Sequence, residues 1–441
     1  MGSQKVDKAA NHVMQDVTCA CCACLCDDIE LTIQNNRIVT AKNACAEGQP
    51  RFLRDRGMAQ PACLIQGKPA SLEQGIERAA QLLIAANYPL VFGLRETTIE
   101  AQRGAMSLAD TLGAIIDATD GDYHSASGLA FPKVGESTCS LGEVKNRGDL
   151  IIFWGTDPAE THPRHLERYS LEPEGLFVPG GRTGRTCIVI DTTKTKTAAQ
   201  AESFVQVKPD GDFEAIWTLR ALLAGMELDP AVVQATTGQP LSVWQRLLEQ
   251  VKQAKYGVIF FGASLTNSRG QHLNGDAIRA LTRDLNAHTR FVCRFNRQLP
   301  NASGAENVSA WQTGYPFAVN LARGYPRFGP GEYTASEVLS RQEADAALIV
   351  SGDPAAHLPA AARQHFVSLP TVALQTLDTP SPRHATVIFN VGANGIEVPG
   401  TMYRLDDVPL PLRAVLASSL PSDCHVLSRL EQRVKQLQTQ K

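Results

Sequence analysis

The sequence lacks long apolar runs, runs of charge of one sign and an apolar segment near its first residue. Its longest apolar runs, Leu150–Trp154 and Tyr256–Phe261, fall well short of the roughly 18–20 residues that a membrane-spanning helix needs. Residues 1–16 are polar and contain no signal-peptide core. We therefore expect a cytoplasmic protein with no membrane partner.

The charges are nearly balanced, which argues against a polyanionic partner. The chain has 42 Lys and Arg residues and 45 Asp and Glu residues, for a formal net charge of −3. Proteins that bind a phosphate backbone concentrate positive charge, so no nucleic-acid partner is expected. Hydrophobic residues form 43% of the 441 residues, which is typical of a folded globular protein. A chain of this length is too long to fold around one hydrophobic core, so we expect about two or three domains.

The cysteines crowd near the N-terminus. Six of the eleven fall within the first 45 residues: Cys19, Cys21, Cys22, Cys24, Cys26 and Cys45. In a reducing compartment such crowded thiols suit metal or cluster ligation better than a disulfide framework. The first 60 residues are therefore interpreted as a small cysteine-rich lobe.

Four of these thiols form a candidate ligand set. Cys19, Cys22 and Cys26 make a C-x₂-C-x₃-C pattern, and Cys45 supplies a fourth thiol beyond a hairpin predicted around two adjacent asparagines. Four thiolates suit a [4Fe–4S] cluster or tetrahedral zinc, and an empty remnant of such a site is the third interpretation. A second C-x₂-C pair overlaps this set, so the ligand register stays open.

After residue 60, strand patterns alternate with helix patterns. The apolar runs Leu150–Trp154 and 186–190 are typical of strands buried on both faces of a parallel sheet, and residues 71–86 have apolar positions at helical spacing. The alternation predicts an α/β fold with open, mainly parallel sheets. We predict the cysteine-rich lobe over 1–60, α/β domains over 61–215 and 216–410, and a helical tail over 411–441. The apolar face of that tail is expected to dock on its own domain.

Several ordered motifs resemble one known family. They lie at residues 17–30, 43–48, 141–149, 162–165 and 395–409, and the match extends over about 17–413. Together they resemble the B subunit of formylmethanofuran dehydrogenase, in the molybdopterin oxidoreductase superfamily. The resemblance implies a cluster lobe followed by two α/β domains of the molybdopterin-oxidoreductase type, which hold a bis-pterin guanine dinucleotide cofactor with molybdenum or tungsten.

The sequence departs from the redox members of this family at the metal ligand. In those members a Cys or selenocysteine stands directly before a His-Gly-Pro-Ser-like segment, whereas here Tyr123 occupies that position beside His124. A phenol with a pKa of about 10 is a poor substitute for a soft thiolate. The resemblance therefore implies that molybdenum or tungsten bis-pterin is absent and that this chain has no catalytic residue.

Other polar motifs admit a structural interpretation. Asp191, at a strand end, and Asp212 are expected to mark a vestigial pterin-dinucleotide site, although an Asp there equally suits a helix cap or turn. The segment from His162 to His165 is interpreted as a structured surface loop.

The resemblance then points to the bacterial formyltransferase/hydrolase complex of one-carbon metabolism. That complex passes a formyl group from tetrahydromethanopterin to a methanofuran-type carrier and hydrolyses it to formate. We expect this chain to be its non-redox structural subunit, with the other subunits of the complex as partners. The alternative is the catalytic molybdenum or tungsten B subunit of a formylmethanofuran dehydrogenase, which interconverts CO2 or formate and formylmethanofuran. A bare iron–sulfur electron carrier would not need the long α/β body.

Overall fold

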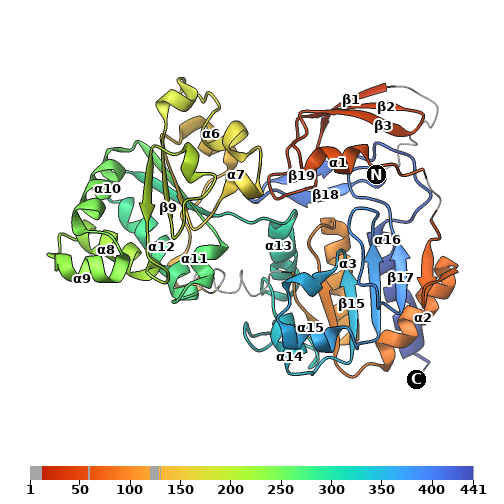
Figure 1. The fold of residues 1–441 in the computed structure, drawn as a ribbon. Coiled ribbons are helices and arrows are strands. Elements are labelled where there is room, and N and C mark those ends of the chain that lie inside the picture. The colour runs from red at the N-terminus through yellow and green to blue at the C-terminus, as the bar shows by residue number, and fades with distance from the viewer. Residues whose placement is uncertain (1–11, 58–59, 120–128, 130, 441) are drawn as a thin grey trace. The chain divides into compact units, whose positions relative to one another are not determined.

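The computed structural model describes residues 12–57, 60–119, 129 and 131–440 (Figure 1). The chain forms two compact units. Met1–Asp122 and Leu299–Lys441 together form unit 1, and Tyr123–Gln298 form unit 2. Because unit 2 is inserted into the sequence of unit 1, unit 1 is built from two separated stretches of chain.

The N-terminal part of unit 1 is a small antiparallel sheet. Its described strands are β1 (His12–Val17), β2 (Ile29–Gln34) and β3 (Arg37–Lys42), paired in that order, and helix α1 (Gly48–Leu53) follows. Asn35 and Asn36, between β2 and β3, have φ angles of 50° and 59°, the left-handed backbone of a tight hairpin turn. The hairpin predicted from the sequence is confirmed.

Unit 1 is organised around a mixed sheet that has nine strands over the described residues. The strand order is β14-β13-β7-β6-β15-β16-β17-β4-β5, and the stretch from β7 to β17 is parallel. The strands are β4 (Cys63–Ile65), β5 (Lys68–Ala70), β6 (Pro89–Gly93), β7 (Ile115–Ile116), β13 (Val319–Asn320), β14 (Arg327–Phe328), β15 (Ala346–Val350), β16 (Thr371–Gln375) and β17 (Val387–Asn390). In β6, Val91 faces one core cluster whereas Leu90 and Phe92 face another. The sheet is therefore buried on both faces.

Helices cover both faces of this sheet. On the side of Val91 lie α2 (Leu72–Ala85), α3 (Ile99–Leu112) and α16 (Asp423–Gln438); on the opposite side lie α14 (Ala335–Ser340) and α15 (Ala360–Phe366). Helix α13 (Ala302–Thr313) packs beside α3, and the strands β18 (Gly400–Tyr403) and β19 (Pro409–Leu412) form a separate hairpin.

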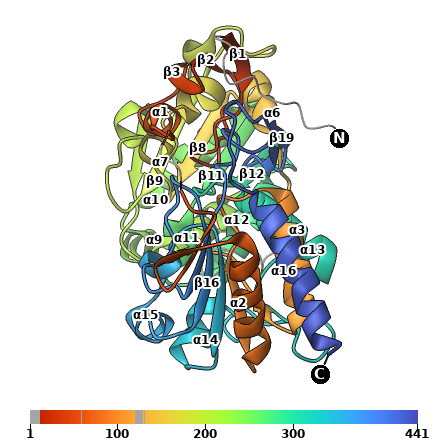
Figure 2. The ribbon, with the colours of Figure 1, turned by 90° about the vertical axis from the view of Figure 1, so that its right-hand side faces the viewer.

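The C-terminal helix docks on its own unit, as the sequence predicted. Figure 2 shows α16 alongside α3, and it also packs against α2. Its apolar face is fully buried in the core of unit 1 through Val426, Leu427, Leu430 and Val434. Burial of these side chains from water stabilises the association of the two separated stretches of chain.

Unit 2 contains a sheet of five strands over its described residues, and all pairs are parallel. The order is β10-β9-β8-β11-β12, with β8 (Leu150–Trp154), β9 (Thr186–Asp191), β10 (Ser203–Gln206), β11 (Tyr256–Phe261) and β12 (Arg290–Phe295). Helices α8 (Asp212–Leu223), α10 (Leu241–Gln253) and α12 (His272–Leu285) pack on one face. The other α-helices in the described part of unit 2 are α5 (Phe131–Val134), α6 (Leu141–Arg147), α7 (Pro158–Thr161), α9 (Pro230–Thr237) and α11 (Ala263–Asn267).

A glycine permits close packing between two strands of unit 2. Gly257 of β11 pairs with Phe291 of β12, and a Cβ added to Gly257 would lie 2.0 Å from Cε2 of that ring. Gly257→Ala is therefore expected to lower the free energy of unfolding by about 1–3 kcal/mol, because the buried ring must leave its rotamer. Urea unfolding of the full chain measures this. Gly142→Ala in α6 is the control, since its nearest neighbour is 3.5 Å away, and an equal loss in both variants would contradict the packing argument.

The units do not follow the domain boundaries that the sequence predicted. Strands on both sides of the 215/216 boundary belong to the one sheet of unit 2, and β6 of the first predicted domain pairs with β15 of the second. The lobe predicted at 1–60 and the tail predicted at 411–441 both belong to unit 1. Periodicity identifies elements locally, whereas strand pairing joins segments far apart in sequence. In the described ranges, no helix has the length and apolarity to cross a bilayer.

Candidate functional site

The loop between β1 and β2 carries five of the six N-terminal cysteines. The N–H of Cys19 donates to the carbonyl of Cys26 at 2.8 Å, so the two ends of the loop meet, and the N–H of Leu25 donates to the carbonyl of Cys22 at 3.2 Å. Leu25 packs with Met402 of β18 and Leu412 of β19. The hairpin β18–β19, which contains part of the 395–409 motif, therefore supports the cysteine loop on its apolar side.

The fourth thiol approaches this loop from the start of α1. Cys45 precedes α1, and its carbonyl accepts from the N–H of Gln49 at 2.9 Å. A Cβ added to Gly48 would lie 3.2 Å from Sγ of Cys19 and 3.8 Å from Sγ of Cys45. Both sulfurs therefore border the same small space, which a side chain at position 48 would fill.

The thiols of the loop are hydrogen-bonded to one another in pairs. Cys19 is hydrogen-bonded to Cys21, which together with burial holds the pKa of Cys19 well above its usual value and lowers that of Cys21. Cys24 is likewise hydrogen-bonded to Cys22, and the pKa of Cys24 is raised whereas that of Cys22 is lowered. The two cysteines outside the predicted ligand set are thus partners of two inside it.

The predicted thiolate-bound centre is not preformed among the described thiols. The backbone brings Cys19, Cys22, Cys26 and Cys45 into one loop-and-helix unit, and glycine leaves room beside two of the sulfurs. Among the described residues, no three or more His, Cys, Asp or Glu side chains stand ready to hold a metal ion. Ligation would require the thiols to exchange their mutual hydrogen bonds for the metal, and the predicted ligand set stays a prediction.

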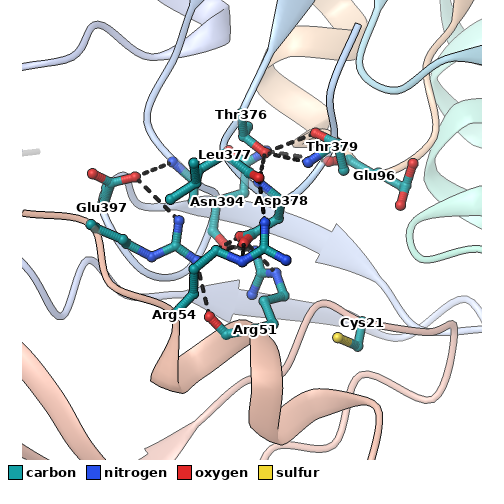
Figure 3. Close-up of polar contacts among 12 residues, drawn as sticks. Cys21, Arg51, Arg54, Glu96, Thr376, Leu377, Asp378, Thr379, Asn394 and Glu397 are labelled. Carbon is teal, nitrogen blue, oxygen red and sulfur yellow. Dashed lines mark hydrogen bonds and ion pairs between the residues drawn. The ribbon is translucent and has the colours of Figure 1, made fainter. Parts of the chain in front are cut away.

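A cavity of about 200 Å³ adjoins the lobe, at the carboxyl ends of β6 and β16. It is lined by Ala20, Cys21, Glu47, Pro50, Arg51, Arg54, Glu96, Thr376, Asp378, Thr379 and Asn394. Figure 3 shows the polar contacts around Arg51 and Asp378. Carboxyl ends of parallel strands are the usual ligand-binding edge of open α/β sheets. Nη1 of Arg51 and Oδ1 of Asn394 are buried and have no hydrogen-bond partner among the described residues. The cavity can therefore serve a polar ligand that presents both an acceptor and a donor.

One carboxylate beside this cavity forms ion pairs with the three arginines that follow Cys45. Nη2 of Arg56 lies 2.8 and 2.7 Å from the two oxygens of Asp378, and Nε of Arg51 and of Arg54 lie 3.4 and 3.6 Å from them. Nη1 of Arg56 also lies 3.7 Å from Glu397. We call these five residues the Asp378 cluster. The Asp378 side chain is only 9% exposed, so its attraction to the guanidiniums is weakly screened by water.

The sequence analysis missed the Asp378 cluster. Three arginines within six positions, Arg51, Arg54 and Arg56, were visible in the sequence. Nothing in the sequence around Asp378 connects it to them, since the partners are more than 300 positions apart.

The two aspartates predicted for a dinucleotide site serve the fold of unit 2. Asp212 accepts from the indole N–H of Trp154 at 2.9 Å, and burial raises the pKa of Asp212. Oδ1 of Asp191 accepts from the N–H groups of Thr192 and Thr193 at 2.7 and 3.4 Å, and burial raises the pKa of Asp191 as well. These bonds are those of a helix start and a turn. A role for either residue toward a dinucleotide stays a prediction.

The loop predicted to lie on the surface is buried instead. His162 and His165 are both fully buried. Nε2 of His162 donates to the carbonyl of Arg297 at 2.7 Å, and the ring of His165 packs edge-on against Phe260. Burial lowers the pKa of His162 to about 4 and that of His165 to about 3, so both are neutral at neutral pH. The prediction was wrong because a Pro between polar residues gives no sign of the aromatic side chains against which the loop packs. Tyr123 and His124 lie outside the described residues.

Comparison with solved structures defines the class of fold. Acetylene hydratase from Pelobacter acetylenicus matches 96% of this chain and 69% of that chain, with a TM-score of 0.71 and 12% identity. A chain of the formyltransferase/hydrolase complex (FhcABCD) from Methylorubrum extorquens, crystallised with methylofuran, matches 86% of this chain and all of that chain, with a TM-score of 0.69 and 24% identity. The fold is that of the molybdopterin oxidoreductases, as predicted.

Sequence relatives then define the family, although the chain matches no family model. The B subunit of tungsten-containing formylmethanofuran dehydrogenase 2 from Methanocaldococcus jannaschii is 39% identical over 434 residues, 96% of this chain and 99% of that protein. Its counterpart from Methanococcus maripaludis is 36% identical over 435 residues, 97% of this chain and all of that protein. The B subunit of the formyltransferase/hydrolase complex Fhc from Methylorubrum extorquens is 26% identical over 345 residues, 78% of this chain and 88% of that protein. The chain belongs to the family of formylmethanofuran dehydrogenase B subunits, whose named relatives are parts of multi-subunit complexes.

Proposed function

We propose that this chain is the non-redox, structural B subunit of a cytoplasmic formyltransferase/hydrolase complex. The complex would convert formyl-tetrahydromethanopterin to formate through a methanofuran-type carrier, with its chemistry in the other subunits. One feature of the sequence carries the proposal: by its resemblance to the family, the chain has Tyr123 where redox members have a Cys or selenocysteine ligand. Molybdenum and tungsten bound by pterin dithiolenes take a soft thiolate or selenolate, and a neutral phenol does not replace it.

The contacts in unit 2 support this proposal. The bis-pterin cofactor implied by the fold would need polar groups at the carboxyl edge of the sheet of unit 2, and Asp212 is already hydrogen-bonded within the unit. Asp212 is 5% exposed, and its carboxylate accepts a hydrogen bond from the indole N–H of Trp154. A buried acceptor already satisfied within the fold gains nothing by exchanging that bond for a ligand.

The cysteine lobe is proposed to keep a structural centre. Cys19, Cys22, Cys26 and Cys45 would hold a [4Fe–4S] cluster, and zinc or an empty site are the other outcomes. A metal centre there would cross-link the β1–β2 loop to α1 and so stabilise the folded lobe. No electron transfer through this centre is needed for formyl transfer or hydrolysis.

A second candidate function is the catalytic tungsten subunit of a formylmethanofuran dehydrogenase. It is favoured by the 39% identity over almost the full length of the Methanocaldococcus jannaschii relative, against 26% for the Fhc relative. The two candidates differ in whether tungsten or molybdenum is bound.

Metal analysis of the native complex decides between them. We expect only traces of tungsten and molybdenum, because the ligand position holds Tyr123. Inductively coupled plasma mass spectrometry of the purified complex measures both metals, together with iron and zinc. One tungsten or molybdenum atom per chain would overturn the proposal in favour of the dehydrogenase. About four iron atoms per chain with matching acid-labile sulfide would identify the cluster.

A further inference from the structure

Helix α1 joins the thiol set to the Asp378 cluster. Cys45 lies three positions before its first residue, Gly48, and Arg51 lies in its last turn. The other two arginines of the cluster follow the helix directly. Because α1 has only six residues, a change at one end of this short segment is transmitted to the other.

The far end of the cluster is held rigidly. The N–H of Asp378 donates to Oγ1 of Thr376 at 3.1 Å, and the hydroxyl of Thr379 is hydrogen-bonded to the same Oγ1 at 2.8 Å. This turn follows β16, a strand in the middle of the main sheet of unit 1. The carboxylate therefore occupies a position set by the sheet and not by the lobe (Figure 3).

The arginines bind the backbone of the same region as well as the carboxylate. Nη2 of Arg51 donates to the carbonyl of Asn394 at 2.6 Å, and Nη1 of Arg54 donates to the carbonyl of Leu377 at 2.6 Å. Nη2 of Arg56 also donates to the carbonyl of Arg51 at 3.0 Å, which closes the end of α1. Each of the three guanidiniums thus has a fixed place around Asp378 among the described residues.

We infer that Asp378 is a positioning residue for the thiolate centre, because its carboxylate fixes α1 and thereby holds Cys45 beside Cys19. This inference rests on the proposed metal site. Removing the charge of Asp378 leaves three guanidiniums close together, and the acid of the cluster that remains is Glu397, at 3.7 Å from Arg56. Repulsion among the three guanidiniums displaces the end of α1. Gly48 and Cys45 move with the helix.

The test is cobalt binding by the full-length chain under anaerobic conditions. Co²⁺ is the probe, since its absorption bands report how many thiolates bind it. Asp378→Asn is expected to weaken Co²⁺ binding by about 10–100-fold, as loss of a group that orients a ligand generally does. Asp378→Glu is expected to restore most of the affinity. Asp55→Asn is the matched control, because Asp55 lies in the same segment but pairs with exposed Arg37.

The spectrum separates positioning from a loss of stability. The Asp378→Asn protein that binds cobalt is expected to show weaker sulfur-to-cobalt absorption, consistent with three thiolates, while circular dichroism confirms that it is folded. A four-thiolate spectrum with unchanged affinity in Asp378→Asn would overturn the inference. Equal weakening in Asp55→Asn would also overturn it.

A second measurement does not depend on metal. Iodoacetamide alkylation of the metal-free chain, mapped by peptide mass spectrometry, is expected to modify Cys45 several-fold faster in Asp378→Asn than in the unsubstituted protein. Cys293, which is fully buried in unit 2, is the internal reference. Equal Cys45 rates would overturn the positioning role. Absence of cobalt binding by the unsubstituted chain, with faster Cys45 alkylation in the variant, would instead overturn the metal site and leave α1 anchored by Asp378.

Discussion

Omission of this chain from a reconstituted complex is expected to abolish conversion of the formyl group to formate. The proposed structural subunit would act by holding its partners, and a permanent interface of this kind generally buries about 2,000 Å² or more. The relatives of this chain are subunits of multi-subunit complexes. Without it, the transferase and hydrolase subunits should separate, and transfer of the carrier between them should fail.

Co-expression of the remaining subunits with and without this chain measures the effect. Size-exclusion chromatography with light scattering gives the mass of the assembly, and formate release gives its activity. The Gly142→Ala variant of this chain serves as the folded positive control. Full assembly and full activity without the chain would contradict the structural role. Oxidation or formation of a formyl compound by the isolated chain with an electron acceptor would contradict its non-redox character.

Acidification from pH 6.5 to pH 4 is expected to destabilise unit 2 strongly. Neutral His162 satisfies both ring nitrogens, since Nε2 donates to a carbonyl and Nδ1 accepts from the hydroxyl of Thr161 at 2.8 Å. Nε2 of His165 has no partner among the described residues, so a proton there would find no acceptor. Burial lowers the pKa of these groups to about 4 and about 3.

The direction in which stability changes with pH follows from proton uptake. Both pKa values are lower in the folded chain, so the unfolded chain binds more protons below pH 6.5 and stability falls as the pH falls. Above about pH 6.5 the two histidines do not reduce the free energy of unfolding. By pH 4 their protonation lowers the free energy of unfolding by an amount on the order of 5 kcal/mol. That is a large share of the typical total of about 5–15 kcal/mol.

Chemical unfolding of the full chain at a series of pH values measures this loss. His165→Phe is expected to flatten the pH dependence, because a phenyl ring among Phe153 and Phe260 does not titrate. His288→Gln, at an exposed position of unit 2, is the control and should leave the slope unchanged. An unchanged slope in His165→Phe would show that other groups cause the acid sensitivity.

Local patterns in the sequence predicted the elements but not their partners. The run Leu150–Trp154 is a strand with the predicted bounds, because an apolar run needs burial on both faces wherever it is placed. The pairing of β6 with β15 joins residues more than 250 positions apart, and no local signal encodes it. The division into two units was therefore beyond a sequence-based prediction.

The same distinction applies to the candidate site. The cysteine spacing was a local signal, and the structure does bring the sulfurs of Cys19 and Cys45 to the same space beside Gly48. The role of Asp378 was not visible, because its acid side chain acquires a function only through arginines delivered by another part of the chain. Buried polar residues in loops, such as His162, are likewise determined by what the loop packs against.

The insertion of unit 2 into unit 1 has a consequence for biosynthesis. A ribosome delivers strands β4, β6 and β7 early, but their partners β17, β15 and β13 emerge only after all of unit 2. Unit 2 can complete its parallel sheet during translation, whereas the early apolar strands of unit 1 wait without their neighbours. The nascent chain therefore exposes an unfinished hydrophobic sheet for more than 200 residues of elongation, a period in which binding to a chaperone competes with aggregation.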